Sequence, residues 1–221
     1  MEVPPSCPLE DIRNAIIENG FFAAKDPVLG QNIKQMDDDE VHFASAGGLQ
    51  FCKINLLDNP QIQPVLESFF GSYGLGIYRS IGNKPPGNYT FRSSPNIEMT
   101  VLLVQLWSKG SEVIYWERSH KHWLDPVEAD NSLLRVPRAR LHRLGLKPVR
   151  VEFEQGGFAI LDDRTAFEVL RGTATTFAFA RKELVKTWNP MDLPESLRSV
   201  VDNMESTTFG MNVAFGGGNS A

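Results

Sequence analysis

One segment late in the chain constrains the fold most, because strand-forming residues and turn residues alternate along it. Positions 149–153 alternate apolar and charged residues, which is the two-residue period of a strand with one buried face. A Gln-Gly-Gly break at 155–157 precedes the apolar run 158–161, so these two strands are predicted to form a hairpin or a corner. Positions 173–180 are rich in β-branched and aromatic residues. Three strands in succession predict an antiparallel sheet.

Further strands are predicted earlier in the chain. Positions 101–107 are apolar on both faces, as expected of a central strand, and 112–117 are predicted to return as its partner. Positions 21–24 read as a buried strand. Positions 42–54 are predicted to form two short strands about a Gly-Gly turn.

Three helices are predicted from apolar stripes and their end signals. Positions 8–19 place apolar residues on one stripe and are followed by a glycine, which is typical of a helix end. Helices are also predicted at 58–71 and 194–204. The polar stretch 25–39 is instead predicted to be a solvated loop, because its acidic run lacks the glycine of a calcium-binding loop.

Composition limits the class of protein. The chain has 221 residues, enough for one domain, which we place at 1–205. A net charge of −5 argues against a nucleic-acid partner, because no cationic field is available to displace counterions from phosphates. Two cysteines do not make a disulfide framework. The first eight residues lack a cationic and apolar signal, and no apolar run reaches the ~20 residues that span a bilayer. We therefore expect a cytoplasmic protein with no membrane partner.

The tail at 206–221 carries its own pattern. Phe209, Met211, Val213 and Phe215 alternate with small or polar residues before a glycine-rich end. Such a segment either pairs with its own sheet or reaches to another subunit. The tail is therefore a possible interface arm.

Several motifs together resemble a known family. The strand that begins at Gly156-Gly157 ends in Asp162-x-Arg164-Thr165-x-Phe167, and Arg118-Ser119-His120-Lys121 is similar to a Gly-Ser-His-Lys turn. In this order they resemble the phytanoyl-CoA dioxygenase-like family of iron(II)/2-oxoglutarate oxygenases, in which a histidine stands at the position of Phe167. The resemblance implies a mainly β fold with flanking helices around a double-stranded β-helix core of the jelly-roll, cupin-like type.

The resemblance also implies that the metal ligands are degenerate. That family binds iron through two histidines and one carboxylate. The first two come as His-x-Asp or His-x-Glu just before the strand that here ends at Trp107, where this chain has Asn96-Ile97-Glu98. None of the four histidines is followed two positions later by a carboxylate. Asn96, Glu98 and Phe167 are thus the expected degenerate ligand positions.

The cosubstrate site is expected to be degenerate as well. In the family, an arginine on the strand after the distal histidine holds 2-oxoglutarate. That strand has Phe177 and Ala178 here, and Arg181 at its end is the nearest candidate. We expect no cofactor on this chain.

These features lead to a first hypothesis about function. The chain resembles the metal-free subunit of heterodimeric oxygenases in fungal meroterpenoid biosynthesis. It would be a noncatalytic subunit that supports a catalytic dioxygenase homologue, and Fe(II) and 2-oxoglutarate would be bound by that partner.

Two alternatives remain open. One is a metal-independent isomerase or cyclase that uses the vestigial cavity. Its acid or base would come from the charged groups around the predicted site: Glu98, Asp162, Asp163 and Arg164. The other is an active oxygenase with an unusual ligand set, such as Glu98, His120 and His142.

Overall fold

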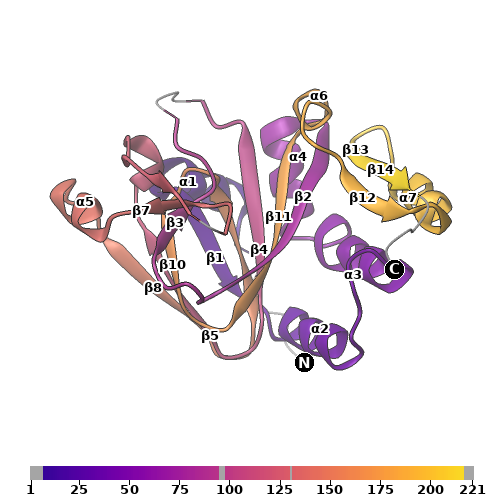
Figure 1. Ribbon diagram of the computed structural model, residues 1–221, viewed down its shortest axis with the longest axis horizontal. Coiled ribbons are helices and arrows are strands. Elements are labelled where there is room, and N and C mark those ends of the chain that lie inside the picture. The colour runs from indigo at the N-terminus through magenta and orange to yellow at the C-terminus, as the bar shows by residue number, and fades with distance from the viewer. Residues whose placement is uncertain (1–6, 95–97, 130, 217–221) are drawn as a thin grey trace.

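The computed structural model describes residues 7–94, 98–129 and 131–216, and within them two six-stranded sheets face each other (Figure 1). The major sheet contains, in spatial order, β1 (Phe21–Lys25), β9 (Gly157–Asp162), β4 (Val101–Trp107), β11 (Thr173–Arg181), β2 (Tyr73–Gly82) and β13 (Phe209–Met211). The minor sheet contains β6 (Val127–Glu128), β7 (Leu134–Val136), β3 (Asn88–Thr90), β10 (Phe167–Arg171), β5 (Ser111–Trp116) and β8 (Pro148–Phe153). A separate parallel pair is formed by β12 (Met191–Pro194) and β14 (Val213–Gly216).

Strands β2 to β5 and β8 to β11 lie alternately in the major and minor sheets. From β8 to β11 the chain crosses between the minor and major sheets at every connection, so the glycine break at 155–157 is a corner. The prediction that the 112–117 strand pairs with the 101–107 strand is wrong. Instead, β5 pairs with β8 and β10, whereas β4 pairs with β9 and β11. The turn between β4 and β5 carries the chain across to the facing sheet. This alternation makes the two sheets a double-stranded β-helix, as expected.

The major sheet separates two apolar cores. One core fills the space between the sheets, and the other lies between the major sheet and the helices. All seven residues of β4 are buried, and the six apolar ones contribute alternately to the two cores. Because both faces are covered, the strand is apolar on both, which confirms its prediction as a central strand.

Helices cover the outer face of the major sheet, and Figure 1 shows α2, α3 and α4 on the side opposite the minor sheet. The α-helices are α1 (Leu9–Asn19), α2 (Pro27–Asp38), α3 (Ala46–Cys52), α4 (Gln63–Phe70), α5 (Arg138–Arg143), α6 (Lys182–Val185) and α7 (Arg198–Met204). A π-helix, η1 (Lys53–Leu57), and two 3-10 turns, η2 (Ser119–Lys121) and η3 (Glu195–Leu197), complete the set. In the described ranges no helix has the length and apolar character needed to cross a membrane.

The stretch 25–39 forms α2 and is not the predicted loop. The Asp26 side chain caps the helix by accepting a hydrogen bond from the Leu29 backbone N–H at 3.0 Å, and Pro27 occupies the first turn. Leu29 and Ile33 are buried on one face. The loop was predicted from the charged residues of this stretch. That prediction was wrong because Leu29 and Ile33, four residues apart, give the stretch the apolar face of a helix.

Residues 42–54 form α3 and the start of η1, so the predicted strands there are wrong. Ser45 caps α3, since its Oγ accepts a hydrogen bond from the Gly48 N–H at 3.1 Å. A Cβ atom on Gly48 would lie 2.2 Å from the carbonyl oxygen of His42. The glycine therefore allows close packing of a helix and does not form a hairpin turn.

The tail pairs with its own chain. In β13, Phe209 and Met211 lie beside β2, and in β14, Val213 and Phe215 lie beside β12. Phe209 is buried, and the other three side chains are half-buried against the core on the helix side. The four side chains predicted as a possible interface arm thus contact the chain's own core. Residues 217–221 lie outside the described ranges.

The two adjacent glycines of α3 give a matched test of this packing. We expect Gly48→Ala to lower the free energy of unfolding by about 2 kcal/mol or more, because the new methyl group would overlap backbone atoms. Gly47→Ala adds a methyl group whose nearest neighbour is a Val41 methyl 3.1 Å away, so it should change stability by less than about 1 kcal/mol. Urea unfolding of both variants measures the difference, and equal effects would contradict the packing.

Candidate functional site

The position of the family's distal histidine lies inside the barrel and is apolar. Phe167 is the first residue of β10, is fully buried, and belongs to the core between the sheets. The ring of Phe91 stacks against it, with the ring centroids 6.4 Å apart and the planes inclined by 30°. Two aromatic rings therefore meet where a histidine ligand would be required.

Phe167 contacts a residue in the connection between β3 and β4 for which the sequence analysis predicted no role. Asn96 lies outside the described residues, and Glu98 is exposed and lines a smaller cavity beside Arg181. The connection between β3 and β4 instead presents Phe91 to the barrel. Two residues further on, the Ser93 Oγ atom is buried and has no hydrogen-bond partner among the described residues. Phe91 and Ser93 are separated by one residue, as are the two ligands of a His-x-carboxylate pair.

The predicted cosubstrate region of β11 offers no inward cation. Phe177 belongs to the helix-side core, Ala178 belongs to the core between the sheets, and Arg181 is exposed at the strand end. Strand β2 places the guanidinium group of Arg79 near the Phe91–Phe167 pair. The Arg79 guanidinium carbon lies 6.0 Å from the centroid of the Phe91 ring, and its Nη2 donates to the carbonyl oxygen of Asn131.

The alternative ligand set is not brought together. His142 lies on α5 with its ring edge against Trp116, His120 lies beside α1, and Glu98 lines a different cavity. Among the residues that the structure describes, no three His, Cys, Asp or Glu side chains are close enough to share a metal ion. With a phenyl ring at Phe167 and Glu98 exposed, the described donor set does not fit iron.

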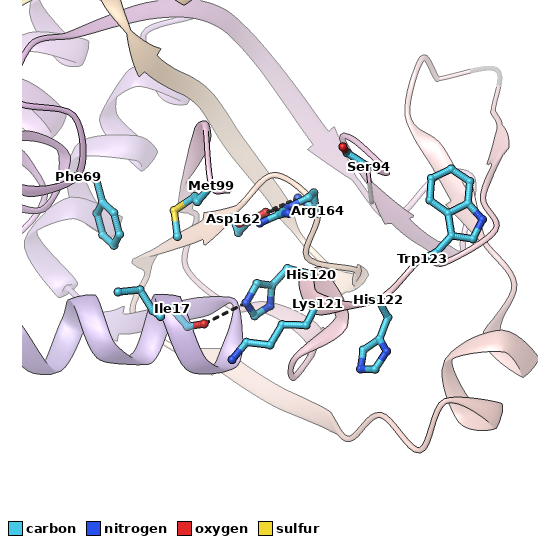
Figure 2. Close-up of a pocket in the computed structure, with 10 residues that line it drawn as sticks. All are labelled: Ile17, Phe69, Ser94, Met99, His120, Lys121, His122, Trp123, Asp162 and Arg164. Atoms are coloured by element: carbon cyan, nitrogen blue, oxygen red, sulfur yellow. Dashed lines mark hydrogen bonds and ion pairs between the residues drawn. The ribbon is translucent and has the colours of Figure 1, made fainter. Parts of the chain in front are cut away.

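A cavity of about 730 Å³ opens at the same end of the barrel (Figure 2). It lies between α1, α4, the turn η2 and the turn that joins β9 to β10. Its described lining consists of Ile17, Phe69, Ser94, Met99, His120, Lys121, His122, Trp123, Asp162 and Arg164. Neither Phe91 nor Phe167 belongs to this lining, so the cavity is offset from the position where iron would be expected.

Two buried ion pairs shape the turn between β9 and β10. Arg164 donates from Nε and Nη2 to the two carboxylate oxygens of Asp162, at 2.8 and 2.7 Å, and both side chains are almost fully buried. Arg92 donates from Nη2 to Oδ1 of Asp163 at 3.2 Å, and its Nε lies 2.9 Å from Oδ2 in the same ion pair, with the arginine side chain partly exposed. Burial raises the pKa of Asp163 to about 7, although Arg92 opposes the shift. Three of the four charged groups predicted around the site thus lie on one turn, and Glu98 does not.

His120 joins the end of α1 to this turn. Its Nε2 lies 3.1 Å from the carbonyl oxygen of Ile17 and donates to it, while Nδ1 is buried without a partner among the described residues. The ring packs so closely on Gly20, which has a φ of 94°, that a Cβ atom there would lie 2.5 Å from Nδ1. Thr165 Oγ1 donates to the Gly20 carbonyl oxygen at 2.8 Å. These contacts assign His120 a structural role.

The two sheets form a double-stranded β-helix, and the Phe91–Phe167 pair lies between them. No protein-family model and no curated protein sequence matches the chain. Solved structures do match. The epimerase SnoN, solved with Fe3+, alpha ketoglutarate and nogalamycin RO, is 14% identical over 78% of this chain and 83% of that chain, with a TM-score of 0.57.

Two other solved structures are also similar in fold to this chain at low sequence identity. EctD from S. alaskensis, in its apoform, is 10% identical over 82% of this chain and 80% of that chain, with a TM-score of 0.51. AviO1 from Streptomyces viridochromogenes Tue57 is 12% identical over 79% of this chain and 96% of that chain, with a TM-score of 0.50. At these identities the similarity shows the fold alone.

The position of His120 predicts acid sensitivity. Burial lowers its pKa below the ordinary 6.5, although the charge of Asp162 and the Ile17 carbonyl partly offset the effect. The unfolded chain therefore takes up a proton that the folded chain resists, so the contribution of His120 to the free energy of unfolding should fall as pH drops below 6.5. Asp163, whose pKa is raised to about 7, contributes with the opposite sign in this range, so the contribution of His120 is the difference between wild type and His120→Gln.

His120→Gln can still donate to the Ile17 carbonyl but does not titrate, so it should lose this part of the pH dependence. His122→Gln, on the exposed cavity rim, should keep it. Urea midpoints at pH 7.5 and 5.5 measure the slopes. Identical slopes in wild type and His120→Gln would refute the prediction.

Proposed function

We propose that this chain is a noncatalytic protein of the 2-oxoglutarate oxygenase fold, and that it serves as the partner subunit of an iron-bearing homologue. The contact between Phe91 and Phe167 carries the proposal. Phenyl rings have no lone pair to give a metal, and in this place they pack as part of the core between the sheets. Fe(II) and 2-oxoglutarate would then be bound by the partner.

The retained scaffold supports a role in an assembly. Both sheets, the helical layer and the buried ion pairs are present, although the ligand positions are apolar. A subunit with an intact surface and no metal can still stabilise a homologue or shape its pocket. We expect an obligate interface of ~2,000 Å² or more. Because the described part of the tail packs in cis, the interface would use another surface.

The pathway is proposed from resemblance. The motifs are similar to those of the metal-free subunits of fungal meroterpenoid dioxygenases, and SnoN is described as an enzyme of nogalamycin biosynthesis. Both belong to secondary metabolism. We therefore place this chain in secondary-metabolite biosynthesis, with a meroterpenoid pathway as the specific proposal.

Copurification tests the partner role. The full chain, tagged and expressed in its native host, should capture a homologue that contains a His-x-Asp pair, in a near-equal amount. Turnover by that homologue should rise at least severalfold when the two are coexpressed.

Two variants serve as controls. Removing a metal ligand from the homologue should abolish turnover, whereas Glu98→Gln in this chain, at an exposed site, should leave turnover unchanged. A chain that purifies alone and changes neither the solubility nor the activity of any coexpressed homologue would refute the role.

A metal-independent isomerase or cyclase is the second candidate. The buried Asp163 favours it, because a carboxyl group with a pKa near 7 can exchange a proton at neutral pH. Both carboxylates of this turn are paired with an arginine: Arg164 donates to both oxygens of Asp162, and Arg92 contacts both oxygens of Asp163. Asp163 is the better suited of the two, because Arg92 is partly exposed whereas Arg164 is buried.

This candidate predicts turnover by the purified chain in chelator and without oxygen. A terpenoid taken from the partner's pathway is the substrate to use. Asp163→Asn should reduce the rate at least 100-fold, in line with the loss of a general base, and Glu98→Gln should not. An absence of turnover by the wild-type chain would remove this candidate.

A further inference from the structure

The cavity at the barrel mouth has apolar ends and a polar middle. Figure 2 shows Phe69, Met99 and Ile17 together on one side and Trp123 on the far side. The Asp162–Arg164 pair and His120 lie between them. A volume of about 730 Å³ falls within the usual range for small-molecule sites, which is roughly 300–1,000 Å³. The shape suits an elongated guest with two apolar ends.

The charges around the middle are already matched within the protein. Arg164 makes two side-chain hydrogen bonds and one backbone hydrogen bond to Asp162, so the charges of this buried pair cancel. His120 donates to the Ile17 carbonyl. At the rim, the Lys121 Nζ lies 3.0 Å from a carboxylate oxygen of Glu18. A charged guest would lose its hydration and would meet no unmatched opposite charge among the buried lining groups described.

We propose that this cavity binds an uncharged, elongated and mainly apolar small molecule. The apolar ends of the guest lie against Phe69 and Met99 on one side and Trp123 on the other. Its polar middle contacts the Asp162–Arg164 pair. The inference stands on the cavity alone and does not depend on a partner subunit. It also requires no iron, because the aromatic pair at the metal position is not part of the lining.

Two fluorescent probes test the charge preference directly. N-phenyl-1-naphthylamine and 1-anilinonaphthalene-8-sulfonate share one aromatic framework, and only the second carries a sulfonate. We expect the neutral probe to bind the full-length chain saturably, at about one probe per chain, and the sulfonated probe to bind at least tenfold more weakly. Equal or tighter binding of the sulfonated probe would overturn the proposed ligand class.

A matched pair of substitutions locates the site. Ile17 is 40% exposed and lines the cavity, whereas Ile54 is 49% exposed and does not belong to the described lining. Ile17→Trp should fill one end and weaken binding of the neutral probe at least tenfold. Ile54→Trp should leave binding unchanged. Thermal unfolding of each variant shows whether it is folded.

Trp123→Ala, at the opposite end, should weaken binding severalfold and gives a second variant if Ile17→Trp is unstable. No saturable binding by wild type, or wild-type affinity in both cavity variants, would overturn the proposal. Because these titrations use the isolated chain, their failure leaves the partner experiment unaffected.

Discussion

The contact between Phe91 and Phe167 is the interaction on which this account depends. It joins the connection after β3 to the start of β10, where the resembling family has its distal histidine at the position of Phe167. Further aromatic contacts lie in the core between the sheets. Phe21 stacks on Tyr115, and Trp107 stacks on Phe153, so aromatic side chains fill the space between the sheets. The polar groups at these rings are paired with one another, since Tyr115 Oη accepts from Trp107 Nε1 and donates to Gln105 Oε1, and no three His, Cys, Asp or Glu side chains cluster among the described residues.

The mouth of the barrel is nevertheless held in a defined shape. The turn after β9 is tied to the end of α1 through the Gly20 carbonyl, which accepts from the Asp162 backbone N–H at 2.9 Å and from Thr165 Oγ1 at 2.8 Å. Ser119 of η2 accepts from the Ala166 N–H. These bonds, together with the buried Asp162–Arg164 pair, fix the walls of the cavity. A chain with a phenyl ring at Phe167 therefore still has a shaped pocket at the mouth of the barrel.

Much of the fold could be predicted from local pattern. The period-two and apolar runs located β4, β8, β9 and β11, because burial on one or both faces leaves a direct trace in sequence. The pairing of β4 with β5 was wrong, since a short turn does not reveal whether the chain folds back in one sheet or crosses to the other. α2 was missed although its cap and apolar spacing were present.

The site was predicted only in part. Phe167 followed from its motif, but the first ligand pair was sought next to β4, and β3 is too short at three residues to be recognised from its period. The contact of Phe91 with Phe167 was therefore not predicted, and the roles expected for Asn96 and Glu98 stay predictions. The cavity could not be foreseen, because its walls come from positions as far apart as Ile17 and Arg164, which only the tertiary fold brings together.

Metal content of the purified chain tests the central claim most directly. After incubation with ferrous ion under anaerobic conditions and removal of excess metal, the wild-type protein should retain far less than one iron per chain. The variant Phe91→His/Ser93→Asp/Phe167→His, which places the missing donors at the facing positions, should retain clearly more. One iron per wild-type chain, lost on His120→Ala, would contradict the account and would identify a working metal site.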